Sequence, residues 1–163
     1  MLEILTLGDE RLKKHSILVP EFDGEIRLLA EQMFESMYQS KGIGLAAVQV
    51  GKLIRFFITH VEGDQPRVFI NPEIVETSLD QELREEGCLS LPGLNSDVVR
   101  PSGVRVQAWN ERGRPFTLEA ESLLARVIHH ELDHLNGVLF IDRLDAKKRE
   151  RLIKRYDRQL QSS

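Results

Sequence analysis

The chain is poor in the features that tie a protein to a membrane or to the outside of the cell. Its 163 residues contain one cysteine, Cys88, so no internal disulfide can form, which is typical of a reducing compartment. No apolar stretch approaches the roughly 20 residues that a helix needs to cross a bilayer. The segment Met1–Arg11 lacks the basic region and apolar run of a secretory signal. We therefore expect a cytoplasmic protein.

Internal repeats, low-complexity segments and recognisable linkers are also missing, so residues 1–163 predict a single domain. Apolar residues make up 41% and charged residues 29% of the chain, the balance of an ordinary globular protein. Its charge is uneven, because segment 145–163 holds seven basic and three acidic residues while the whole chain has a net charge of −4. A basic end on an acidic body is typical of contact with a polyanion, and a solvated helix surface is the alternative.

Periodicity and turn residues predict helices near both ends of the chain, with strands between them. Asp23 can cap a helix that runs to about Ser40, with Gly42 as its stop. Later helices are predicted over Glu121–Asn136 and Ala146–Leu160. The predicted strands are Leu53–Thr59, Arg67–Asn71, Val104–Trp109 and Phe116–Glu119. This order predicts an α+β fold: antiparallel β-sheets around a central buried helix, with an N-terminal helix and a basic C-terminal helix.

The central helix carries His130-Glu131-Leu132-Asp133-His134. Two histidines four residues apart leave a helix on one face, so both imidazoles can bind a single cation, and the intervening glutamate lies near enough to handle protons. The helix is apolar on most sides, which predicts burial. Buried imidazoles and carboxylates are costly unless they are paired or bound to a cation. A metal site is therefore favoured over hydrogen-bonded core histidines.

Cys88, in Glu86-Gly87-Cys88-Leu89-Ser90, is the candidate third ligand. A thiolate beside a glycine, where the backbone can come close to a bound group, suits a borderline cation. One cysteine with two histidines leaves a fourth coordination position open, which marks a catalytic rather than a structural metal site. A lone cysteine is more often a small buried hydrophobic residue, and that alternative stays open from these residues alone.

Together with Gly42-Ile43-Gly44-Leu45-Ala46-Ala47-Val48-Gln49, these segments resemble the signatures of peptide deformylases. Those metallohydrolases remove the formyl group from the N-formylmethionine of new polypeptides. The family patterns G-x-G-L-A-A-x-Q, E-G-C-L-S and H-E-x-D-H occur here in the same order, at residues 42–49, 86–90 and 130–134. The resemblance extends over most of the chain. It departs at His129, where the family more often has glutamine, and which lies about 100° around the helix from His130, outside the ligand set.

The resemblance implies a role for each motif residue. Glu131 becomes the general acid/base that takes a proton from the metal-activated water and passes it to the leaving amine. Gln49 and the backbone N–H of Leu89 stabilise the developing oxyanion. Asp133 falls away from the metal face and is expected to form an ion pair with Arg100 or Arg126. The implied metal ligands are Cys88, His130 and His134.

The same resemblance implies where the peptide binds. The runs Ile43-Gly44 and Glu86-Gly87 can hold an extended peptide by strand-like hydrogen bonds. The candidates for the methionine pocket are Ile43, Leu123 and Val127, because Val127 and Leu123 lie one and two turns before His130 on its own face.

One divalent metal ion per chain is implied, Fe²⁺ physiologically, with Zn²⁺, Ni²⁺ or Co²⁺ able to occupy the site. The implied partners are N-formylmethionyl nascent peptides. The basic segment 145–163 further predicts contact with the ribosome. Neither a membrane nor DNA is expected as a partner.

Two alternatives compete with this interpretation. A zinc endopeptidase could use the same helix motif, but its long form needs a third histidine at position 140, where this chain has Phe140, and Glu150 is the one downstream glutamate. A ribosome- or RNA-associated metal protein without catalysis is the second alternative. A requirement for the N-formyl group would exclude the first, and turnover would exclude the second as the sole function.

Overall fold

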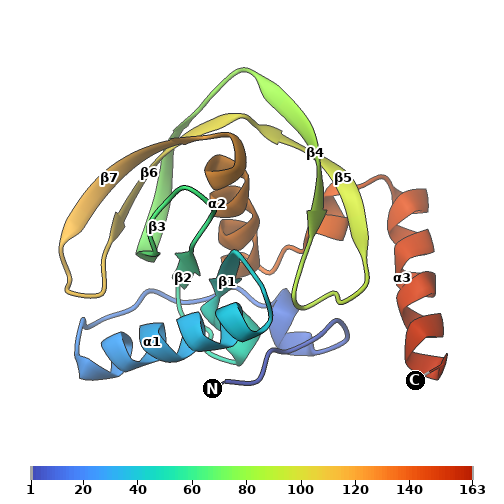
Figure 1. Ribbon diagram of the computed structural model, residues 1–163, viewed down its shortest axis with the longest axis horizontal. Coiled ribbons are helices and arrows are strands. Elements are labelled where there is room, and N and C mark those ends of the chain that lie inside the picture. The colour runs from blue at the N-terminus through green and yellow to red at the C-terminus, as the bar shows by residue number, and fades with distance from the viewer. Residues whose placement is uncertain (1, 163) are drawn as a thin grey trace.

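The computed structural model describes residues 2–162 and has the predicted α+β fold, in which two antiparallel sheets flank one buried helix (Figure 1). A five-stranded sheet has the order β1-β2-β3-β6-β7, and β4 pairs with β5 alone. The elements in chain order are η1 (Glu10–Lys13), α1 (Gly24–Gln39), β1 (Gly44–Ala46), η2 (Ala47–Val50), β2 (Phe56–Thr59), β3 (Arg67–Thr77), β4 (Gln81–Gly87), β5 (Asn95–Pro101), β6 (Gly103–Trp109), β7 (Pro115–Glu121), α2 (Ser122–Leu135), η3 (Phe140–Arg143) and α3 (Ala146–Ser162).

Helix α1 begins and ends where the sequence predicts, but the residue that turns the chain after it differs. The carboxylate of Asp23 accepts hydrogen bonds from the first backbone N–H groups of the helix. Lys41, with a φ of +59°, takes the left-handed turn that was predicted for Gly42. A Cβ on Gly42 would lie 2.7 Å from Cδ1 of Leu89. The glycine therefore lets the Leu89 side chain come close, and the predicted turn residue is wrong by one position.

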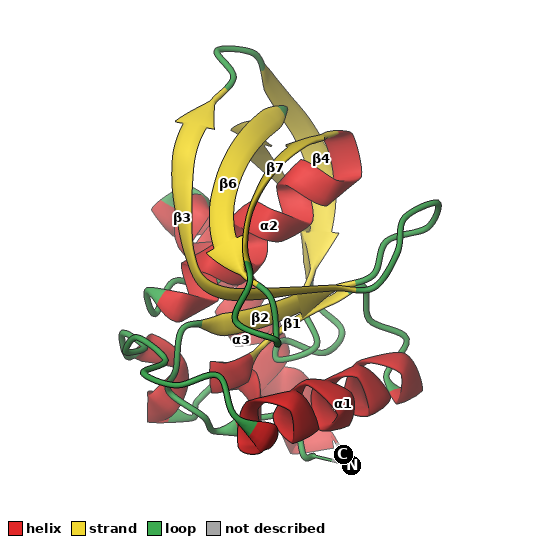
Figure 2. Ribbon diagram, turned by 90° about the vertical axis from the view of Figure 1, so that its left-hand side faces the viewer, coloured by secondary structure: helices red, strands yellow, loops and turns green. Residues whose placement is uncertain are grey.

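The five-stranded sheet is bent around the central helix. Strands β1 and β2 lie between α1 and the foot of α2, whereas β3, β6 and β7 rise beside α2 (Figure 2). Strand β3 continues to Thr77, beyond the predicted end at Asn71, which has a φ of +50° next to an irregular register. Strand β2 begins at Phe56 rather than Leu53, because the backbone of Leu53 and Arg55 pairs with Ile17 instead.

Helix α2 is the central element, and its boundaries match the prediction within a residue. Ala125, Ile128 and Leu135 pack into one apolar cluster with residues of β2, β3, β6 and β7. At its C-terminal end, the guanidinium of Arg55 donates hydrogen bonds to the carbonyl of Leu135 and to Oδ1 of Asn136, at 3.2 and 3.0 Å. The first bond satisfies a backbone carbonyl that the helix itself leaves open, and both bonds hold the end of the helix in place.

Helix α3 lies on the outside of the molecule, beside β5 (Figure 1). Its Tyr156 is 4% exposed and packs with Leu91, Leu94 and Val98, so the helix covers the loop that follows Cys88. Within residues 2–162, no helix is both long and apolar enough to cross a membrane.

Candidate metal centre and active site

The three predicted metal ligands come together in the folded chain. The Sγ atom of Cys88 and one ring nitrogen from each of His130 and His134 all lie within 4.8 Å of one another. Cys88 Sγ and His134 Nε2 lie 3.3 Å apart. Helix α2 presents both imidazoles on one face, and the cysteine follows the last residue of β4. In the described part of the chain, no other cluster of three or more such side chains is found.

The donor set fits a divalent cation. Thiolate and imidazole are the donors that zinc and iron prefer, at about 2.3 Å from sulfur and about 2.0–2.1 Å from nitrogen. Burial lowers the pKa of His134 well below its ordinary value, and the nearby positive charges add to this, so its ring is neutral and has a lone pair to give. Burial also opposes a proton on His130, but hydrogen bonds to Cys88 and Glu86 outweigh it and raise that pKa. A cation must displace this proton.

The side chain of Glu86 orients the first histidine, a role that the sequence did not reveal. Its Oε1 lies 2.9 Å from Nδ1 of His130. Arg100 donates to both Glu86 oxygens, at 2.8 and 2.9 Å, and Arg126 donates to Oε2 at 2.6 Å. Burial raises the pKa of Glu86, but the hydrogen bonds from Arg100 and His130 outweigh it and bring it to about 2. The carboxylate is therefore ionised and acts only as an acceptor.

Asp133 belongs to the same buried network. Its Oδ2 accepts a hydrogen bond from Arg100 at 2.7 Å, and its Oδ1 accepts one from Arg143 at 2.7 Å. The predicted pairing with Arg100 is therefore present. Arg126, the other predicted partner, pairs with Glu86 instead, and Arg143 of η3 was not foreseen. Asp133 ties η3 to the metal-binding helix.

Glu131 is 3% exposed, and burial raises the pKa of its carboxyl to about 7. Its Oε1 has no hydrogen-bond partner among the described residues, so it can receive a proton from a molecule in the cavity. A Cβ added to Gly44 would lie 2.6 Å from Oε2. The absence of a side chain on β1 at this point is what lets the carboxylate fit beside the strand.

Gln49 is 1% exposed and reaches the cavity from η2. Its Oε1 accepts the backbone N–H of Ala46 at 2.9 Å. Its Nε2 donates to Ser90 Oγ at 3.0 Å and to Cys88 Sγ at 3.6 Å. The amide therefore presents its donor end, rather than its carbonyl, towards the three-ligand cluster.

These side chains surround a cavity of about 470 Å³. Two of the predicted residues, His134 and Leu123, are not among its lining residues; His134 is 1% exposed beneath the floor. His129 is half-buried outside the ligand cluster, and burial, aided by the charge of Arg100, lowers its pKa to about 4. The predicted residues that do line the cavity are Ile43, Gly44, Gln49, Gly87, Cys88, Leu89, Val127, His130 and Glu131.

The cavity lies between two strand edges beside which residues 2–162 form no further strand. Strand β1 is the edge of the five-stranded sheet, and β4 pairs only with β5. Gly44 of β1 and Gly87 of β4 both line the cavity. Exposed strand edges can pair with an extended peptide, so the shape of the site suits a polypeptide end.

Comparison with known proteins finds a matching family and close sequence relatives. The family model described as polypeptide deformylase matches residues 1–150. The chain is 48% identical to a peptide deformylase of Afipia carboxidovorans, over 94% of this chain and 92% of the relative. It is 52% identical to one of Clostridium botulinum, over 86% of this chain and 94% of the relative.

Solved structures of the same family have the same fold as this chain. A peptide deformylase from Legionella pneumophila has 40% sequence identity and a TM-score of 0.93, with 99% of this chain and 98% of that chain covered. One from Ehrlichia chaffeensis, in complex with actinonin, has 38% identity and a TM-score of 0.92, with 98% and 97% covered. The chain therefore belongs to the polypeptide deformylase family, whose enzymes remove the formyl group from N-terminal formylmethionine.

Proposed function

We propose that this chain hydrolyses the terminal formamide of N-formylmethionyl polypeptides, releasing formate, with one divalent cation bound by Cys88, His130 and His134. The observation that carries the proposal is the convergence of these donor atoms within 4.8 Å, beside a cavity that Glu131 also lines. When bound there, the cation would supply Lewis-acid chemistry, lowering the pKa of water and polarising the formyl oxygen.

Glu131 is the proposed general acid/base. Its unpartnered Oε1 takes a proton from the attacking water and hands it to the methionine nitrogen as the carbon–nitrogen bond breaks. A pKa of about 7 suits both tasks near neutral pH. Gln49 Nε2 and the backbone N–H of Leu89 donate to the oxyanion, and removing one such donor typically costs about 2.7–4 kcal/mol of transition-state stabilisation.

The peptide would bind in extended form between the two strand edges, with hydrogen bonds to Ile43 and Gly44 on one side and Gly87 on the other. Ile43 and Val127 line the cavity and supply apolar surface for the methionine side chain. Leu123 lies one turn before Val127 and outside the lining, so its part in the methionine pocket stays a prediction.

Fe²⁺ is the proposed physiological ion, with Zn²⁺, Ni²⁺ and Co²⁺ as possible occupants. A thiolate with two imidazoles is a donor set that all four accept, so the proposal for iron rests on the family. We further propose that residues 1–163 act as one metallohydrolase domain and that the enzyme works in the cytoplasm, where formylated chains are made and a lone cysteine stays reduced.

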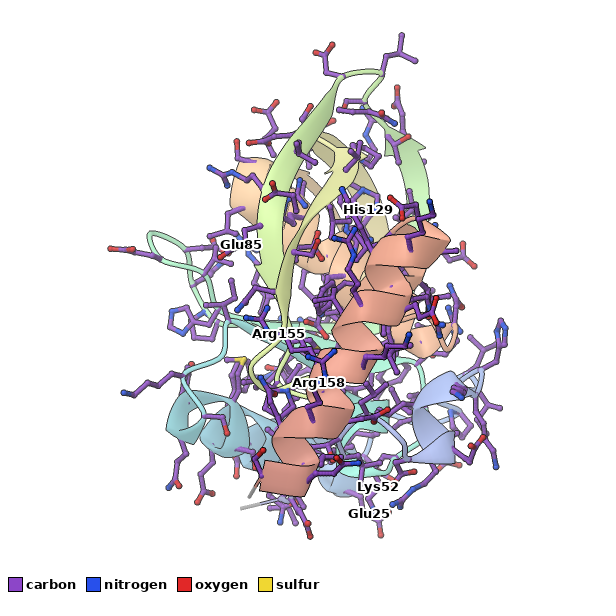
Figure 3. The ribbon with its side chains drawn as sticks, turned by 90° about the vertical axis from the view of Figure 1, so that its right-hand side faces the viewer. Glu25, Lys52, Glu85, His129, Arg155 and Arg158 are labelled. Atoms are coloured by element: carbon purple, nitrogen blue, oxygen red, sulfur yellow. The ribbon has the colours of Figure 1, made fainter. Side chains whose placement is uncertain are left out.

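Contact with the ribosome is proposed for α3. Four basic side chains line one face of the helix, with Ser96 across a groove of about 440 Å³: Lys148, Arg151, Arg155 and Arg158. Arg155 and Arg158 are labelled in Figure 3. Their spacing of three or four residues aligns them on one face, and within residues 2–162 none of the four forms a salt bridge with an acid. A row of unneutralised cations fits the phosphate backbone of ribosomal RNA.

The decisive experiment is a formate assay. Protein purified without air, with its metal counted, should release formate from N-formyl-Met-Ala-Ser and leave the peptide bonds intact. The unformylated peptide is the control. Cleavage of internal bonds in that control would favour the zinc endopeptidase, and absence of formate release by metal-loaded protein would refute the proposal.

A further inference from the structure

Ser90 and Gln49 form a buried side-chain pair between two segments that are distant in the sequence. Gln49 belongs to η2, and Ser90 lies in the loop after β4, 41 positions further along the chain. Gln49 Nε2 donates to Ser90 Oγ at 3.0 Å. Ser90 is fully buried and does not line the cavity. Any effect of its hydroxyl on substrate must therefore pass through Gln49.

The pair holds the Gln49 amide at both ends. Its Oε1 accepts the backbone N–H of Ala46, and its Nε2 gives one of two hydrogens to Ser90. The terminal torsion of a glutamine side chain is otherwise broad, so these bonds select one orientation. Nε2 donates its second hydrogen to Cys88 Sγ across a long contact of 3.6 Å, which directs that hydrogen towards the metal ligands.

The backbone of the two residues is fixed by a single segment. The N–H of Leu5 donates to the carbonyl of Gln49 at 2.7 Å, and the N–H of Leu7 donates to the carbonyl of Ser90 at 2.8 Å. One short segment near the N-terminus therefore contacts the backbone of both partners.

We propose that Ser90 is a positioning residue for deformylation: its hydroxyl holds the Gln49 amide so that the second Nε2 hydrogen meets the formyl oxygen as negative charge develops there. This inference rests on the proposed role of Gln49 as an oxyanion donor. A donor that is already oriented needs no reorganisation during the reaction. Loss of the Ser90 hydroxyl therefore lowers kcat and leaves KM unchanged.

The first test compares Ser90→Ala with Ser36→Ala. Ser36 is a matched control, because its hydroxyl is also buried and hydrogen-bonded, to the backbone of Leu2, but it lies in α1 outside the cavity lining. In formate-release kinetics, Ser90→Ala should lose about tenfold in kcat, the worth of one hydrogen bond, with KM and bound metal per chain unchanged. Ser36→Ala should keep wild-type kcat. Equal kcat for wild type and Ser90→Ala would overturn the proposal.

The second test is a double-mutant cycle with Gln49→Ala. If Ser90 acts through Gln49, then Ser90→Ala causes no further loss of kcat once the amide is gone. The same fold loss in both backgrounds would overturn the positioning role alone. A Gln49→Ala variant with normal kcat would instead remove Gln49 from the proposed function, and this inference with it.

A third readout does not depend on activity. In zinc-loaded protein labelled with ¹⁵N, the side-chain amide signals of Gln49 are assigned by their loss in Gln49→Ala. Ser90→Ala should speed the exchange of these amide protons with water, and Ser36→Ala should not. Unchanged exchange in Ser90→Ala would contradict the inference.

Discussion

Glu86 accepts a hydrogen bond from Nδ1–H of His130, across 2.9 Å. Because an ionised carboxylate can only accept, the bond fixes the proton on Nδ1 and leaves Nε2 with the lone pair that a cation needs. The charge of Glu86 is balanced in turn by Arg100 and Arg126, both of which are buried. One carboxylate therefore sets the tautomer of His130 and forms ion pairs with two guanidinium groups.

Replacing Glu86 with glutamine should weaken both metal binding and stability. Removing one partner from a buried ion pair typically costs about 3–5 kcal/mol, and loss of a carboxylate behind a ligating histidine lowers metal affinity roughly 10–100-fold. Urea unfolding and competition with a chelator measure the two effects. Glu82→Gln, in the exposed pair with Arg84, is the control and should change neither. Wild-type metal affinity in Glu86→Gln would refute the orienting role.

Acid should remove the stabilisation that Glu86 provides. Burial raises its pKa, but the hydrogen bonds from Arg100 and His130 outweigh this, so the folded value is about 2 against an ordinary 4.5. The unfolded chain then binds more protons than the folded chain as the pH falls. The stabilisation is complete above pH 4.5 and is lost as the pH drops towards 2. The free energy of unfolding, measured across this interval, should fall less steeply in Glu86→Gln than in the wild type.

The Glu131→Gln variant should bind its metal ion as the wild type does but lose most of its turnover. No ligand is removed, but glutamine cannot accept a proton from water, so kcat should fall by about 10²–10⁴. Metal content per chain and kcat are measured on the same preparation. A variant that retains near-normal kcat would exclude Glu131 as the proton carrier.

The Cys88→Ser substitution should chiefly weaken metal binding. A hydroxyl is a poor substitute for a thiolate towards borderline cations, so the variant should lose metal during dialysis that the wild type withstands. Metal analysis before and after dialysis gives the comparison, with Ser36→Ala as a matched variant outside the site. Full retention of metal by Cys88→Ser would mean that sulfur is not a ligand.

Charge reversal on α3 tests contact with the ribosome. Arg151→Glu combined with Arg155→Glu changes the groove that these cations line, and should reduce co-sedimentation with ribosomes and its dependence on salt. Lys154→Glu reverses a basic residue that already pairs with Glu150 and should bind more nearly like the wild type. Turnover of N-formyl-Met-Ala-Ser should be unchanged in all of them. Equal, salt-insensitive binding by every variant would refute the contact.

The family and its activity were predictable from sequence because three short motifs carry the resemblance, whereas the buried residues that support these motifs were not. Strand β4 has the sequence Gln-Glu-Leu-Arg-Glu-Glu-Gly, which lacks the alternation of apolar residues that marks a half-buried strand. Its inward residue Glu86 is charged, and it is tolerated because Arg126 approaches from 40 positions away. A pairing between such distant residues leaves no local signal, so the β4–β5 hairpin was missed.

Contacts between distant segments also explain the difference at the turn after α1. Glycine is the usual residue for a left-handed turn, which is why Gly42 was expected there, yet the turn falls on Lys41. Gly42 instead makes room for Leu89, a residue of another motif. Gly42 and Gly44, two glycines of one signature, thus allow other segments to come close to the backbone. The sequence alone does not show whether a glycine is needed for such a contact or for a turn.

The narrow space between Gly44 and Glu131 has a consequence for how this enzyme can change. A methyl group at position 44 would lie 2.6 Å from Oε2 of Glu131 and 2.7 Å from Cγ1 of Val127, so a larger residue there would displace these side chains. A change of peptide preference is easier at the neighbouring Ile43, which lines the same cavity and is 41% exposed, because a larger or smaller side chain there leaves Glu131 undisturbed.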